Sequence, residues 1–333
     1  MLSTLTLPAL AGPRQIAPGV ALTLAIAATS LWLHDQPRLA LASPLIIATL
    51  LGMILRNVGW APAACRPGQT FVLRRLLRAA IVLLGFQISL SQALSIGPTG
   101  LGVVLFAVFG TLTFTLIAGR WLKMDPRFVC LIAAGTAICG ASAIVAANTV
   151  AEAPEEDVAY SIACVTLLGT ISIFLYPALG ALIGLSPRQF GLWSGGSIHE
   201  IAQAVAAAFQ GGAVAGNLGT ITKLCRVALL APVVLGLVAL RRGAPRSAAT
   251  PLPWFLLGFV ATLTLNSVTR IPADIEHLIV QLTTLLMAMA LGAMGLATDL
   301  RALAQRGARP LLLAAGAWVF VMLGVLGLVV RFA

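Results

Sequence analysis

The chain is a succession of apolar segments separated by short polar ones, and this pattern restricts its fold more than any other feature. A helix needs about 20 apolar residues to cross the hydrocarbon core of a bilayer. Eleven segments approach or exceed that length, and we number them as spans one to eleven: Ile16–Leu33, Leu39–Leu55, Leu76–Leu94, Thr99–Ala118, Phe128–Val150, Val158–Leu185, Phe190–Phe209, Ala213–Leu240, Trp254–Val268, Ile275–Leu296 and Pro310–Val330. Only 9% of the residues are charged, against about 25% in a soluble domain. The sequence therefore predicts an all-α, polytopic membrane protein with about 11 transmembrane helices.

The basic residues support this count because they gather on one side of the predicted spans. If consecutive spans cross in alternate directions, fifteen basic residues lie on one side and only Arg38, Arg270 and Arg331 on the other. Lys and Arg are enriched in cytoplasmic loops. We therefore expect a multi-pass protein of the bacterial inner membrane, with the N-terminus in the cytoplasm and the C-terminus outside. The net charge of +11 lies in short clusters without interleaved aromatic residues, so no nucleic-acid partner is expected.

Similar segments five spans apart indicate an internal repeat. Leu77–Leu84 in span three is similar to Cys225–Leu230 in span eight, and glycine-rich stretches interrupt spans five and ten. Because the offset of five is odd, the second copy is inverted in the membrane. We predict an N-terminal segment with an extra first helix (1–35) and two inverted repeats of five spans (36–186 and 187–333), each with a crossing broken helix.

The glycine-rich stretches of spans five and ten have two interpretations. Glycine inside a helix costs about 1 kcal/mol relative to alanine, so its repeated use requires a reason. Transporter helices break near the bilayer midplane and offer backbone dipoles to a ligand, whereas packed helices use small residues to approach closely. Under the first interpretation, the residues at the breaks are Gly135, Thr136, Gly140 and Ser142 in span five and Gly292 and Gly295 in span ten.

A cluster of polar residues lies in the middle of spans seven and eight. Ser197, His199, Glu200 and Gln203 belong to span seven, and Lys223 and Arg226 belong to span eight. Ionisable groups at bilayer depth are costly and usually mark sites for ions or substrate. On a continuous helix, His199 and Gln203 would share one face with Gly196.

We expect spans seven and eight to be antiparallel neighbours, since only Gly211-Gly212 joins them. Glu200 would then pair with Arg226 and leave Lys223 as surplus positive charge. His199 could titrate near neutral pH and couple protons to transport. The alternative is a structural salt bridge without a ligand.

The pair His199-Glu200 also raises the possibility of an enzyme, because His-Glu-x-x-His binds zinc in metalloproteases. Here the position of the second histidine is occupied by Gln203. The five cysteines show no CxxC spacing. We therefore expect no metal, no cofactor and no enzymatic activity, and a membrane-embedded hydrolase is only a remote alternative.

Several stretches resemble the sulfate exporter family of YeiH-like membrane proteins, over nearly the whole chain after span one. They are Leu51–Asn57, Leu77–Gly85, Pro154–Ala159, Ser197–Ala208, Lys223–Arg226 and Pro253–Phe259, of which Ser197-Ile198-His199-Glu200 is the most distinctive. The resemblance implies a fold related to sodium/proton antiporters and bile-acid-type symporters. It also implies a moving core with the crossing helices and a panel that would include spans seven and eight.

The expected function is secondary active transport of a small anion, such as sulfate or an organosulfonate, by alternating access. A coupling ion (proton or sodium) and a homodimer are left open. The candidate substrate-binding residues are those of the polar cluster and of the two glycine-rich stretches. The alternative is a cation-coupled carrier of a non-anionic substrate.

Overall fold

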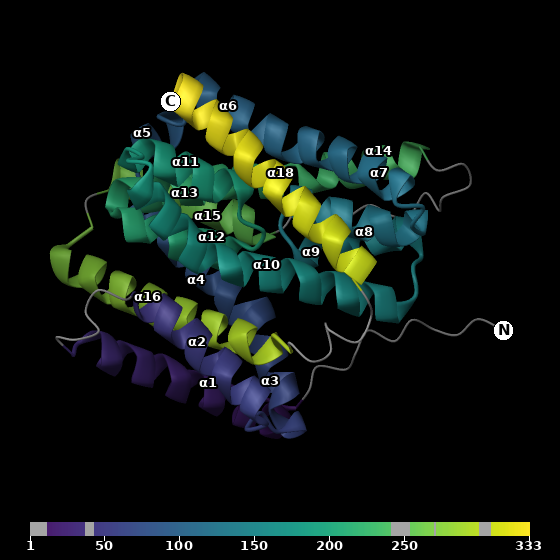
Figure 1. The fold of residues 1–333 in the computed structure, drawn as a ribbon. Helices are drawn as coiled ribbons and strands as arrows, with labels where there is room; N and C mark the ends of the chain where they lie inside the picture. Colours follow the sequence, from purple (N-terminus) through teal and green to yellow (C-terminus); the bar gives the residue numbers. More distant parts are fainter. Residues whose placement is uncertain (1–11, 37–42, 241–253, 270, 300–307) are drawn as a thin grey trace. The chain divides into compact units, whose positions relative to one another are not determined.

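The computed structural model describes residues 12–36, 43–240, 254–269, 271–299 and 308–333. Within these ranges the protein is mainly helical, and each predicted span corresponds to one or more helices, apart from residues 39–42 of span two, which lie outside the described residues (Figure 1). Six helical segments are long and apolar enough to cross a membrane: Pro13–His34, Gly97–Trp121, Glu155–Leu182, Ala213–Leu237, Ala273–Ala297 and Arg309–Phe332. The protein is therefore a polytopic helical membrane protein, as its sequence predicts.

The helices form two compact units, which we describe separately. Unit 1 comprises residues 1–80 and 281–297, and unit 2 comprises residues 81–280 and 298–333. The helical segments of unit 1 are α1 (Pro13–His34), α2 (Pro44–Val58), η1 (Ala63–Cys65), α3 (Arg66–Phe71), η2 (Val72–Leu76), the first half of α4 (Leu77–Leu84) and most of α16 (Ala273–Ala297).

Small residues allow the helices of unit 1 to touch through their backbones. In α16, Gly292 and Gly295 lie against α2, and a Cβ added at Gly52 of α2 would collide with the carbonyl oxygen of Gly292. The helix α16 continues without interruption to Ala297. The predicted break in span ten is therefore wrong: its glycines serve close helix packing, which was the second interpretation.

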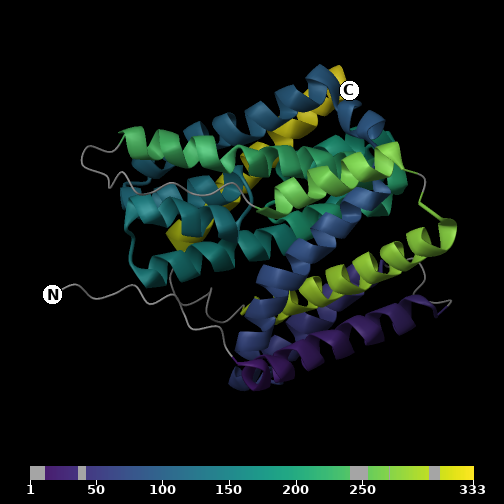
Figure 2. The same ribbon diagram turned by 180° about the vertical axis from the view of Figure 1, so that it is seen from behind.

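Unit 2 contains the remaining helices, which surround two helical hairpins. They are η3 (Gly85–Gln87), α5 (Leu90–Leu94), α6 (Gly97–Leu105), η4 (Phe106–Gly110), α7 (Thr111–Trp121), α8 (Pro126–Ala137), α9 (Ala141–Ala151), α10 (Glu155–Leu182), α11 (Pro187–Ser197), α12 (Ile201–Ala208), η5 (Phe209–Gly211), α13 (Ala213–Ala228), α14 (Leu230–Leu240), α15 (Trp254–Val268) and α18 (Ala308–Phe332). The helix α15 packs beside the end of α4, where Thr262 Oγ1 donates to the carbonyl of Val82 at 2.7 Å (Figure 2).

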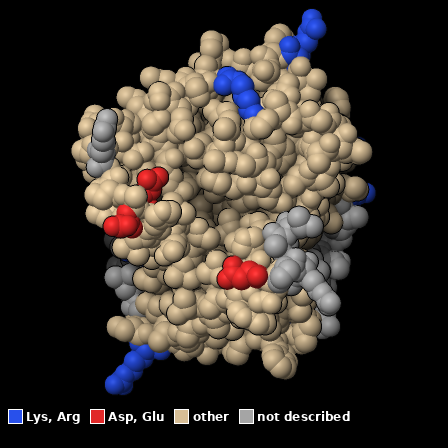
Figure 3. Space-filling model, turned by 90° about the vertical axis from the view of Figure 1, so that its left-hand side faces the viewer, with Lys and Arg blue, Asp and Glu red and all other residues tan. Residues whose placement is uncertain are grey.

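The surface of the protein suits a lipid environment. On α18, Leu312, Leu323 and Val330 are more than half exposed, while Val321 and Val325 on the same helix are fully buried. Large exposed apolar side chains of this kind are favourable in hydrocarbon. Figure 3 shows a face on which charged side chains are sparse among uncharged ones.

Span five does not cross the protein but folds back on itself as hairpin 1 (α8 and α9). Asp125 begins α8 by accepting a hydrogen bond from Arg127 N. The Arg127 guanidinium in turn donates to the carbonyl of Glu152, at the end of α9, at 3.3 Å. A straight helix would place these two residues about 37 Å apart. Both ends of span five therefore lie on the same side.

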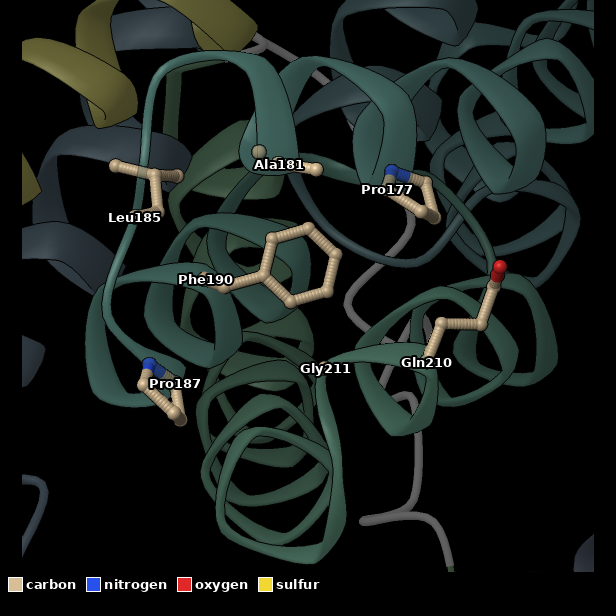
Figure 4. A pocket seen from close by; sticks show the side chains of 8 residues that line it. Pro177, Ala181, Leu185, Pro187, Phe190, Gln210 and Gly211 are labelled. Carbon is tan, nitrogen blue, oxygen red and sulfur yellow. The ribbon is translucent and has the colours of Figure 1, made fainter. Parts of the chain in front are cut away.

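Span seven forms a second hairpin, hairpin 2 (α11 and α12). A capping box between Ser186 and Gln189 begins α11. A Cβ added at Gly211, just after α12, would meet the ring of Phe190 near the start of α11. The start and the end of the hairpin also line one pocket of about 170 Å³, into which the Phe190 ring projects (Figure 4). Since Gln210 in this pocket is bonded to the carbonyl of Ile173, we assign the pocket no ligand.

The two hairpins enter unit 2 from opposite ends of α10. Three residues separate the end of hairpin 1 from the start of α10, and four separate the end of α10 at Leu182 from the start of hairpin 2. With 28 residues, α10 is about 42 Å long, enough to cross a bilayer. The four helices of the two hairpins have only 8 to 12 residues each, so none of them is long enough to cross a bilayer by itself.

This arrangement corrects the prediction that spans five and seven cross the membrane. Replacing a crossing by a hairpin reverses the direction of the spans that follow it. Hairpin 1 therefore reverses span six, and hairpin 2 restores the predicted direction of spans eight to eleven. Among the basic residues only Arg188 changes sides, and the predicted bias falls from fifteen against three to fourteen against four. The acidic run Glu152 to Asp157 also changes sides. The charge pattern therefore could not distinguish hairpins from crossings.

Single cysteines introduced into a cysteine-free variant will test this topology. We expect positions Lys123 and Glu156 to react with an impermeant maleimide from one side of the membrane, and Ile183 and Ala213 from the other. All four are exposed. With eleven alternating crossings, Lys123 and Ile183 would instead react from one side of the membrane, and Glu156 and Ala213 from the other. Labelling of right-side-out and inverted vesicles distinguishes the two patterns.

Candidate binding site at the hairpin tips

The tips of the two hairpins are short non-helical stretches that meet inside unit 2. Tip 1 is Ile138–Gly140 and tip 2 is Ile198–Glu200. At each tip one helix ends and another begins, so carbonyl and N–H groups lose their helical partners. Such groups cost several kcal/mol each if they are left unpaired at bilayer depth. The residues around the tips satisfy many of these groups.

Lys223, on α13, connects the two tips. Its ammonium group donates to the carbonyl oxygens of Ile138 and Ile198, each at 2.7 Å, and it is fully buried. Each carbonyl belongs to the residue that directly follows the first arm of its hairpin. A helix C-terminus carries about half a negative charge, so a cation stabilises it. Lys223 therefore stabilises both hairpins at once.

Arg226 lies one turn further along α13 and binds the same two helix ends. Its guanidinium donates to the carbonyls of Thr136 and Ala137 in hairpin 1, at 2.8 to 3.1 Å. It also donates to those of Gly195 and Ile198 in hairpin 2, at 3.4 and 3.1 Å. A guanidinium has five N–H donors. The five contacts of Arg226 use all five donors. The Lys223 ammonium group has three donors and two carbonyl contacts, so one of its donors remains unused.

Glycines bring α11 and α13 into backbone contact along their length. A Cβ added at Gly191 would meet the carbonyl of Ala215, and one added at Gly195 would meet that of Gly219. This constant offset of 24 residues means that the two helices run in parallel. It also places the cations of α13 beside the end of α11, where tip 2 begins.

Glu200 binds the opposite hairpin. Its Oε1 accepts a hydrogen bond from Ala141 N, the first residue of α9, at 2.6 Å. The preceding Gly140 has φ 71° and would carry a Cβ in collision with the Glu200 carboxyl group. Only glycine combines this backbone conformation with the necessary space. The carboxylate therefore lies at the positive N-terminus of α9.

His199 is fully buried, and neither ring nitrogen has a hydrogen-bond partner in the described residues. A buried polar group without a partner costs about 1–3 kcal/mol. Lys223 and Arg226 both act on it electrostatically. His199 is therefore the polar side chain at the tips with the most unused hydrogen-bonding capacity.

Gln203 and Ser197 have local partners, whereas the buried Thr136 hydroxyl has none in the described residues. The Gln203 amide donates to the Thr166 carbonyl at 3.0 Å and to Thr170 Oγ1 at 3.2 Å, which holds α12 against α10. Ser197 donates to the Trp193 carbonyl of its own helix, and Ser142 is exposed.

The structure thus brings His199, Glu200, Lys223 and Arg226 together with the break of span five, but it corrects two details. Glu200 binds Ala141 rather than the predicted partner Arg226, which binds carbonyls. His199 and Gln203 do not share a helical face, because α11 ends at Ser197 and α12 begins at Ile201. In addition, spans seven and eight belong to the same compact unit as hairpin 1.

The most important groups missed in the sequence are backbone atoms, namely the Ile138 and Ile198 carbonyls and Ala141 N–H. A signal for them exists. Gly135-Thr-Ala-Ile138 and Gly195-Gly-Ser-Ile198 share glycine and isoleucine at the same spacing, 60 residues apart. This similarity aligns tip 1 in span five with tip 2 in span seven. The repeat predicted from the sequence has an offset of five spans and aligns span five with span ten instead.

Replacement of Arg226 by lysine will test its binding of the hairpin ends. We expect Arg226→Lys to destabilise the purified protein by about 2–4 kcal/mol, because an ammonium group has three N–H donors where the guanidinium has five, so at least two of the five hydrogen bonds to the hairpin carbonyls are lost. Arg331→Lys, at the exposed end of α18, is the matched control. Thermal unfolding in detergent measures both. Equal melting temperatures for Arg226→Lys and wild type would contradict the assignment.

Comparison with known proteins identifies the family. The family model described as conserved hypothetical protein 698 matches residues 18–314. The chain is 35% identical to the UPF0324 inner membrane protein YeiH of Salmonella typhi over 92% of its length and 91% of the relative's. It is 39% identical to a UPF0324 membrane protein of Corynebacterium glutamicum, with coverage of 84% and 82%, and 36% identical to one of Bacillus cereus, with coverage of 95% and 94%. The chain therefore belongs to the UPF0324 family of YeiH-like membrane proteins, which confirms the resemblance seen in its sequence.

Proposed function

We propose that the protein is a secondary active transporter of the bacterial inner membrane, which binds a small anion between the hairpin tips and works by alternating access. The observation that carries this proposal is the meeting of two hairpins that enter from opposite ends of α10. Non-helical backbone at membrane depth is tolerated where it is buried in protein or lines a cavity. In transporters, discontinuous helices form substrate sites near the bilayer midplane. The proposal assigns the protein no enzymatic activity.

The charges at the tips favour an anion. Lys223 and Arg226 contribute two positive charges and Glu200 one negative charge, so the three side chains sum to +1. All five Arg226 donors are used on carbonyls, so Arg226 supports the tips rather than binding the substrate directly. The donors that remain for an anion are one N–H of Lys223, the His199 imidazole and the first-turn N–H groups of α12, whose N-cap side chain makes no capping bond. Sulfate and organosulfonates offer several acceptor oxygens to such a set.

Substrate binding requires the tips to separate. His199, Lys223 and Arg226 have no exposed surface in this structure, so an anion cannot reach them as they stand. Because the bases of the hairpins lie at opposite ends of α10, movement of one hairpin would open the tips toward one side only. This geometry supports alternating access, in which the two sides open in turn.

Transport assays on the purified protein will test the proposal. In proteoliposomes we expect uptake of sulfate or ethanesulfonate that responds to an imposed proton or sodium gradient. We expect His199→Ala to lower the rate roughly tenfold or more, because a hydrogen bond to a charged group contributes about 1.5–3 kcal/mol. The exposed His277→Ala on α16 is the control. Gradient-driven uptake restricted to neutral or cationic compounds would instead support the alternative of a cation-coupled carrier.

A further inference from the structure

The Glu200 carboxylate occupies the place at the tips that is best suited to an anion. It accepts the Ala141 N–H at 2.6 Å at the N-terminus of α9, in a space that Gly140 leaves open. Helix N-termini bind anions because their N–H groups are unpaired and the helix dipole is positive there. This N-terminus therefore already holds an anion, supplied by the other hairpin.

In the part of the chain that the structure describes, no hydrogen-bonded ion pair holds Glu200. Lys223, on α13, acts on Glu200 electrostatically, but the hydrogen bonds of its ammonium group go to Ile138 and Ile198. The thiol of Cys139, at tip 1, also interacts electrostatically with the carboxylate. His199 and Arg226 are the other charged and titratable groups at the tips among the described residues. The bond to Ala141 is therefore the main directional contact that keeps Glu200 in place.

We infer that Glu200 is an internal competitor of the transported anion and that the two occupy the α9 N-terminus in turn. This inference rests on the proposed function and extends it to the coupling mechanism. Glu200 takes up one proton from water on the open side and becomes a neutral carboxylic acid. It then releases Ala141 N–H, which the anion accepts. When the anion leaves, Glu200 returns its proton to water and binds Ala141 again.

Exclusive occupancy would couple one proton to each anion without a separate proton site. In one state the tips hold ionised Glu200, and in the other they hold the anion and a protonated Glu200. A negative group faces the α9 N-terminus in both states. A state that holds the transported anion and ionised Glu200 together is unfavourable, because two negative charges at one helix N-terminus repel strongly in a low dielectric. A state with neither leaves the buried cations without an opposing charge.

Sulfate binding to the detergent-solubilised, full-length protein will test this inference. We expect wild-type affinity for sodium sulfate, measured by titration calorimetry, to rise up to about tenfold for each unit of decreasing pH while Glu200 is ionised, since each bound anion brings one proton. Glu200→Gln, which keeps an acceptor for Ala141 N–H but carries no charge, should bind sulfate at least as tightly at all pH values. The control Glu276→Gln, on the exposed first turn of α16, should retain the wild-type pH dependence.

The outcomes separate the inference from the proposed function. Sulfate binding whose pH dependence persists in Glu200→Gln would overturn the inference and leave anion transport intact, with His199 as the proton-binding group. Weaker binding by Glu200→Gln at every pH would make Glu200 a direct ligand and would also overturn it. Absence of sulfate and sulfonate binding by wild type at any pH would refute the proposed substrate class itself. Should Glu200→Gln fail to fold, wild-type affinity that does not change with pH would still decide against competition.

Discussion

The structure depends on the need to pair backbone groups that lose their helical partners inside a membrane. Each hairpin tip interrupts a helix where water is scarce, so the released carbonyl and N–H groups must find other partners. Two cations on one helix supply partners for the carbonyls, and a carboxylate supplies one for an N–H. The ionised side chains are thus stabilised by helix ends as well as by one another, which explains how they persist at this depth without a direct salt bridge.

Much of this site could be predicted from the sequence, because the energetic cost of buried charge makes clusters of ionisable residues conspicuous. His199, Glu200, Lys223 and Arg226 stand out in apolar surroundings, and all four lie at the tips. Their partners could not be predicted in the same way. Every residue has a carbonyl and almost every residue an N–H, so a sequence does not distinguish the few that are bound from the rest.

The path of the chain was harder to predict for a related reason. Hydropathy reports how many consecutive residues tolerate lipid, and residues 187–211 are long enough for one crossing or for two half-crossings. Glycine is similarly ambiguous. Gly140 marks a true break because its φ is positive, whereas Gly292 and Gly295 lie in a regular helix beside α2. Only the neighbouring helix decides between these uses, and the neighbour is unknown until the chain is folded.

The backbone contact between α11 and α13 has a consequence for the mechanics of the protein. At the glycine contacts there are no side chains between the two helices that could rearrange, so we expect α11 and α13 to move together as a rigid body. Tip 2 then travels together with Lys223 and Arg226. The bonds that can yield are those to Thr136, Ala137, Ile138 and Ala141, all of them in hairpin 1. In the proposed transport cycle, hairpin 1 would therefore be the moving element, and the assembly of α11 and α13 would be the rigid surface against which it closes.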